Sequence, residues 1–197
     1  MLVEHLKTAA ESAPEGRPRW SCLLNLADAI NGAGRPDASL IFFEQAAAQA
    51  KAVADAGGDD SRQAWSDLAV ITGNWGSALR AVGNLEEARQ RQLESVEVAK
   101  KAGLPAIKVL GRELEALRIE IMQGQVAAAL PEVEKRLVRI PIGRKNWLYL
   151  ESVITHMTRG RVTIDELLPD RWSAAHPHSV REYREQARRN KGDTATP

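Results

Sequence analysis

Apolar residues recur along most of the chain at intervals of three and four, the period of an amphipathic α-helix. Leu23, Leu26, Ala27 and Ile30 show this spacing. Short stretches between the periodic segments combine glycine or proline with polar residues, a composition that ends helices; they are 12–18, 32–36, 56–60, 82–84, 102–105, 123–125 and 139–143. The pattern predicts an all-α chain in which short loops join antiparallel neighbours.

The helical segments repeat as pairs. Gly34, Gly83 and Gly124 occupy equivalent loops roughly 40 to 50 residues apart, a period typical of helical repeats. Seven residues before these glycines stand Ala27, Gly76 and Leu117, and five residues after them stand Ser39, Ala88 and Ala129. The period indicates hairpins stacked into a solenoid rather than a closed bundle. The small residues five positions after each glycine would let the second helix of a pair press closely against the first.

The segment "LAVITGNWGSALRAVGNLEEARQRQLESVEVAKKAG" resembles a tetratricopeptide repeat of the longer kind, found in kinesin-light-chain-like and bacterial signalling arrays. The residues that fill the family pattern are Trp75, Gly76, Leu79, Gly83, Ala88 and Ser95. Thr72 and Gln92 stand where the family has large residues, and Lys100 stands where it has proline. The pairs before and after this segment match the pattern less fully.

The resemblance implies a right-handed α-solenoid of antiparallel helix pairs with atypical capping helices. The expected organisation is a capping helix over 1–16, three helix pairs over 17–141, a degenerate fourth pair or cap over 142–175, and a polar terminal helix with a frayed tail over 176–197. Apolar residues between Trp147 and Met157 are expected to cover the end of the array. If that cap is incomplete, the same residues are where a homodimer is expected to form.

In the family, the first helices of successive pairs line a concave groove that binds a peptide or a helix of another protein. Carried over residue by residue, this groove includes Asn25, Asp28, Val70, Asn74, Ser77, Arg80 and Arg118. The same carry-over adds Leu24, Gly73, Gly111, Leu114 and Glu115. The alternative is that these residues form only the solvated face of amphipathic helices.

Asn25 and Asn74 hold the same position in adjacent pairs, which suggests that their amides bind the backbone of an extended ligand. Arg80 and Arg118 would then add specificity. Family members that clamp a terminal carboxylate use two lysines, two asparagines and an arginine in the groove. Only Asn74 fits that set, so a clamp of this kind is not expected.

Composition limits the partners. In 197 residues, 27 Lys and Arg balance 26 Asp and Glu, so no global field favours nucleic acid or a membrane surface. The basic residues between Arg181 and Lys191 alternate with acidic ones and indicate a solvated helix. The single cysteine, Cys22, lies in an apolar run and is expected to be a buried thiol in a reducing, cytoplasmic environment. No signal segment or membrane span is apparent.

No catalytic residue, metal site or cofactor is expected. His156, His176 and His178, with Asp165 or Asp170, match no common zinc spacing. Three tryptophans, Trp20, Trp65 and Trp75, are expected in the core between helices, and Glu86 and Glu87 favour a helix start.

The leading interpretation is a non-enzymatic module that binds a protein or peptide partner in the groove. One alternative is a sensor or regulatory domain cut from a larger bacterial signalling protein, and a further one is an enzyme with a site around His156.

Overall fold

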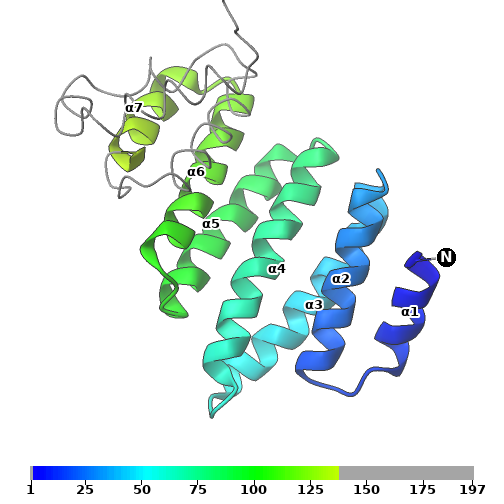
Figure 1. Ribbon diagram of the computed structural model, residues 1–197. Helices are drawn as coiled ribbons and strands as arrows, with labels where there is room; N and C mark the ends of the chain where they lie inside the picture. The colour runs from blue at the N-terminus through cyan, green and yellow to red at the C-terminus, as the bar shows by residue number, and fades with distance from the viewer. Residues whose placement is uncertain (1, 138–197) are drawn as a thin grey trace, which may run out of the picture. The chain divides into compact units, whose positions relative to one another are not determined.

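The computed structural model describes residues 2–137, which form α-helices and no strand (Figure 1). The helices are α1 (Leu2–Ser12), α2 (Arg17–Gly32), α3 (Pro36–Ala56), α4 (Ser61–Ala81), α5 (Leu85–Lys101), α6 (Ala106–Met122) and α7 (Val126–Leu137). The all-α prediction is therefore confirmed for this part of the chain, and each of the first six predicted breaks separates two helices. The loop at 139–143 and the segments 142–175 and 176–197 lie outside the described residues.

The loop glycines that define the repeat are placed alike. Gly34, Gly83 and Gly124 follow α2, α4 and α6, and their φ angles are 79°, 88° and 87°. A positive φ suits glycine because it has no Cβ to clash with the backbone. After Gly34 the N–H of Arg35 donates to the carbonyl of Ile30 at 3.2 Å, and after Gly83 Asn84 donates to Leu79 at 3.0 Å. Both helices thus end in the same glycine-dependent turn.

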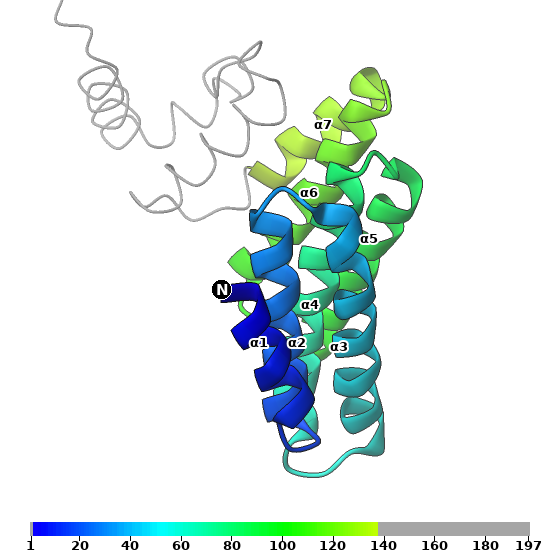
Figure 2. The same cartoon turned by 90° about the vertical axis from the view of Figure 1, so that its right-hand side faces the viewer.

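The chain divides into two compact units, Met1–Gln123 and Gly124–Pro197. In the first unit, each helix from α1 to α6 packs against the next one along the chain. Figure 2 shows α2 in front of α4 and α3 in front of α5, so the helices form two layers. In the second unit the structure describes α7, and the boundary between units separates the two helices of the expected third pair.

The predicted small residues lie in the core. Ser39, Ala88 and Ala129, each five residues after a loop glycine, are all 0% exposed. Trp20 and Trp75 are buried, as expected. These outcomes follow from local spacing, because residues three to four apart share one side of a helix.

Two expectations about burial need correction. Trp65 is only partly buried, near the start of α4, with the ammonium of Lys101 3.5 Å from its ring centroid. Cys22 is a free thiol that is also only partly buried, at the edge of the core rather than within it. Both residues have the apolar periodicity of a core position but lie on the rim of the helical stripe.

Candidate functional site

Surface residues of the even-numbered helices form the candidate site, which we call the even-helix face. We define it by Asn25 and Asp28 of α2, Val70, Asn74, Ser77 and Arg80 of α4, and Glu115 and Arg118 of α6. The four residues from α4 are three or four positions apart and therefore follow successive turns. Val70 is 39% exposed.

A polar contact joins the face where α2 meets α4. The amide nitrogen of Asn74 lies 3.1 Å from each carboxylate oxygen of Asp28 and donates to them. Partial burial raises the pKa of Asp28 above its ordinary value, and the hydrogen bond from Asn74 opposes this rise. A ligand that approaches the Asn74 amide therefore meets the Asp28 carboxylate with it. Asn25 is exposed one turn before Asp28.

A second polar cluster lies where α4 meets α6. Nη1 of Arg118 lies 3.3 Å from a carboxylate oxygen of Glu115, and the Arg118 side chain is only 12% exposed. Burial lowers the pKa of Arg80, the nearby charge of Arg118 lowers it further, and Glu115 acts in the opposite direction. The Nε atoms of Arg80 and Arg118 are buried and have no hydrogen-bond partner within the described part of the chain. The ion pair that the structure shows here is the one between Arg118 and Glu115, both on α6.

Some of the residues carried over from the family are not on this face. A Cβ added to Gly73 would lie 3.2 Å from Oγ of Ser95, so Gly73 faces α5. Gly111 and Leu114 are buried within the packing of α6, and Leu24 is partly buried against the core. The expectation that Gly111 and Leu114 line the groove is wrong, because both are buried. Gly73 is used instead in the close packing of α4 on α5.

Beneath the face, a polar network joins α4, α5 and α6. Nε2 of Gln92 donates to the carbonyl of Gly73 at 2.8 Å, and Oγ of Ser95 donates to the carbonyl of Ala69 at 2.6 Å. Nε of Arg112 donates in turn to Oγ of Ser95 at 2.8 Å. The network fixes the backbone of the helix that supplies half of the face. Sequence reasoning treated Gln92 only as a departure from the family, although its position on the buried stripe of α5 indicated an internal partner.

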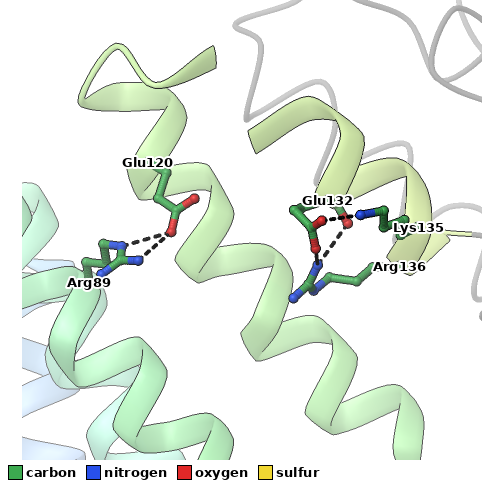
Figure 3. Close-up of polar contacts among 5 residues, drawn as sticks. All are labelled: Arg89, Glu120, Glu132, Lys135 and Arg136. Atoms are coloured by element: carbon green, nitrogen blue, oxygen red, sulfur yellow. Dashed lines mark hydrogen bonds and ion pairs between the residues drawn. The ribbon is translucent and has the colours of Figure 1, made fainter. Parts of the chain in front are cut away.

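Figure 3 shows ion pairs that lie outside the even-helix face. Nη2 of Arg89 on α5 lies 2.7 Å from a carboxylate oxygen of Glu120 on α6. Glu120 stands four residues before its loop glycine, where the other pairs have Ile30 and Leu79, and Arg89 explains how a charge is accommodated there. Within α7, Glu132 pairs with Lys135 and Arg136, which lowers the pKa of Glu132.

The other sites considered from the sequence concern metal binding, a membrane span and the C-terminal segment. Over residues 2–137, no group of three or more His, Cys, Asp and Glu side chains could hold a metal ion, and no helix is long and apolar enough to cross a membrane. The segments that contain His156, His176, His178, Asp165, Asp170 and the basic residues from Arg181 to Lys191 are outside the described residues. So is the apolar segment from Trp147 to Met157.

Comparison with known proteins adds no relative. The sequence matches no protein-family model, and neither a curated protein nor a solved structure matches it.

Proposed function

We propose that this chain is a tetratricopeptide-like right-handed α-solenoid that acts without catalysis, by binding a segment of a partner protein on the even-helix face. The repeated helix pairs support the proposal. Their loop glycines share one conformation, and the small residues after those glycines share complete burial. Arrays of this kind present one helix of every pair on a common extended surface.

The observation that carries the proposal is the convergence of polar side chains at both junctions of that surface. Asn74 reaches from α4 to Asp28 on α2, and on α6 Arg118 pairs with Glu115. Here, Asn74 is hydrogen-bonded to Asp28 across two helices and Arg118 is paired with Glu115 on a third, so the face carries oriented polar groups of the kind that recognise polypeptides.

Photo-cross-linking tests this placement of the partner. A photoreactive residue at Val70 on α4, exposed on the even-helix face, is compared with one at Gln45, exposed on α3 in the other layer. Both proteins are irradiated in lysate of the source cells. We expect Val70 to capture a partner that Gln45 does not capture.

A matched pair of variants then tests the face itself. The double variant Asn74→Ala with Arg80→Glu should lose the cross-linked partner while keeping its helical circular dichroism. The control, Gln45→Ala with Lys100→Glu, makes the same kinds of change at exposed positions of α3 and α5 and should keep it. Equal capture by both double variants, or equal cross-linking from Val70 and Gln45, would refute the proposal.

A further inference from the structure

We propose that Asp28 is the subsite for one basic side chain, a lysine or an arginine, of the bound protein segment. This inference rests on the function proposed above and specifies its ligand. Asp28 is an exposed residue of α2 at the junction with α4, where the amide of Asn74 reaches both of its carboxylate oxygens.

The contact with Asn74 orients the carboxylate without neutralising it. A single amide nitrogen lies 3.1 Å from each of the two oxygens. An ionised carboxylate can accept about four hydrogen bonds, so one donor group leaves part of that capacity for a ligand. Because Asp28 is exposed, a donor from another molecule can reach the remaining positions.

Asp28 differs from the neighbouring carboxylates in having no cation beside it. Asp67 on α4 pairs with Arg17 of α2 at 3.0 Å, and Glu115 on α6 pairs with Arg118. In the part of the chain that the structure describes, Asp28 forms no ion pair, and its side-chain partner is an uncharged amide. Partial burial accordingly raises the pKa of this carboxyl group. A cationic ligand would supply the charge that the array itself does not place there.

The surroundings of Asp28 suit the shape of a basic side chain. Val70, which is 39% exposed, precedes Asn74 by four positions, a distance of about 6 Å along α4. Lysine and arginine each have an apolar stem and a charged end. The stem can therefore lie against Val70 while the charged end reaches Asp28.

Charge and ligand count separate this class of group from two others. An acidic side chain would be repelled by the Asp28 carboxylate. A divalent metal ion requires several oxygen ligands, and over residues 2–137 no group of three or more His, Cys, Asp and Glu side chains could hold one. A single oriented carboxylate is sufficient for one ammonium or guanidinium group.

A display selection tests the subsite without knowledge of the natural partner. The full chain is immobilised and short random peptides are selected on it, with an unrelated helical protein as the background. We expect the enriched peptides to share a lysine or an arginine. Asp28→Asn should weaken their binding about tenfold, as expected when a charged hydrogen-bond partner is lost. The new amide oxygen can still accept from Asn74, so this variant should keep its helical circular dichroism.

A matched variant and two changes in the peptide separate the subsite from a structural effect. Asp37→Asn makes the same change at an exposed position of α3, in the other layer, and should leave binding unchanged. Replacing the basic residue of the peptide by glutamine should weaken binding to the parent but not further to Asp28→Asn. With glutamate in that place, the peptide should bind Asp28→Lys about threefold or more tighter than it binds the parent, a gain that loss of structure would not produce.

The outcomes are distinguishable. Enriched peptides without a basic residue, or basic peptides that bind Asp28→Asn as tightly as the parent, would overturn the subsite and leave the peptide-binding function standing. Equal weakening by Asp28→Asn and Asp37→Asn would also overturn it, because binding would then follow the net charge of the chain. If no peptide is enriched above the background, the proposed function fails and the subsite fails with it.

Discussion

The pairs α2–α3 and α4–α5 have the same turn but different chemistry at the same place. Phe43 stands nine residues after Gly34, and Gln92 stands nine residues after Gly83. Both are buried, with exposed fractions of 0% and 2%. One pair thus fills its interior with a phenyl ring, and the other fills the equivalent position with an amide.

The second pair accommodates this amide by placing glycines opposite it. Gln92 lies over two glycines of α4, and a Cβ added to Gly76 would come within 2.9 Å of its Nε2 and 3.1 Å of the carbonyl of Ala88. The amide also donates to the carbonyl of Gly73. A repeat can therefore hold a glutamine where the other pair has a large apolar residue. Glycines on the facing helix leave room for the side chain, and a backbone carbonyl accepts the hydrogen bond of its amide.

The largest predicted effect concerns Phe43, the buried phenyl ring of the first pair. Phe43→Ala should lower the free energy of unfolding by about 3–5 kcal/mol, because it removes a fully buried ring and leaves a cavity. Gln92→Ala at the equivalent position should cost only about 1–2 kcal/mol. Urea denaturation of the full chain measures both, and equal losses would mean that the two pairs do not differ as described.

Gly76→Ala tests the close approach of α4 and α5. We expect a loss of about 1–3 kcal/mol, since the new methyl group meets the backbone carbonyl of Ala88 as well as the side chain of Gln92. Gly32→Ala is the matched control, because nothing lies within 4 Å of a Cβ added there. The control should be neutral or stabilising by up to about 1 kcal/mol. A neutral Gly76→Ala would show that the helices are not in tight contact.

Ser95→Ala tests the polar network of the second pair. Its loss should be about 1–2 kcal/mol, because Arg112 and the carbonyl of Ala69 both lose a short hydrogen bond. Ser39, equally buried in the first pair, donates to the carbonyl of Pro36 within its own helix. Ser39→Ala should therefore cost clearly less in the same denaturation experiment, and the reverse order would contradict the network.

Helix capping also differs between the pairs. The Asn84 side chain accepts from the N–H of Glu87 and donates to its carboxylate, so α5 begins with a reciprocal cap. Asn84→Ala should lower the free energy of unfolding by about 1 kcal/mol. Arg35, at the same place before α3, makes no side-chain cap, and Arg35→Ala should change stability by less than about 0.5 kcal/mol. Thermal denaturation compares the two variants, and similar shifts would argue against the cap.

The smallest effect is expected where the two pairs meet. Because the pKa of Asp28 in the folded chain lies above 3.8, the folded state holds this proton more tightly than the unfolded state. The contribution of protonated Asp28 to the free energy of unfolding is fully present below pH 3.8 and is lost as the pH rises through the raised pKa of the folded chain. The parent should therefore lose stability relative to Asp28→Asn across that interval. Melting temperatures measured against pH test this, and a difference independent of pH would contradict it.

Local features were predictable to different degrees. The breaks around Gly34 and Gly83 were correct because glycine and proline act within a few residues. Partial burial of Trp65 was not predictable, since its position near the start of α4 brings it close to Lys101 at the end of α5. The Arg89 to Glu120 pair was likewise missed, because each residue taken alone resembles a solvated charge.

For the candidate site, the sequence indicated residue types and helix faces but not their partners. Asp28, Asn74, Arg80 and Arg118 were all selected, yet nothing local showed that Asn74 donates to Asp28. Gly73 was placed in the groove although it packs against Ser95. A shift of one position along a helix turns a side chain by about 100°, so small errors of register move a residue from one neighbour to another.

By itself, the sequence of this protein determined the helices, their ends and the spacing of the repeat, because these depend on interactions between residues a few positions apart. The tertiary structure decided which faces meet, how closely α4 approaches α5, and which charges share a junction. Those features depend on the rotation and separation of helices whose contacting residues lie tens of positions apart, such as Asp28 and Asn74. No local pattern encodes that geometry; only packing of the whole array does.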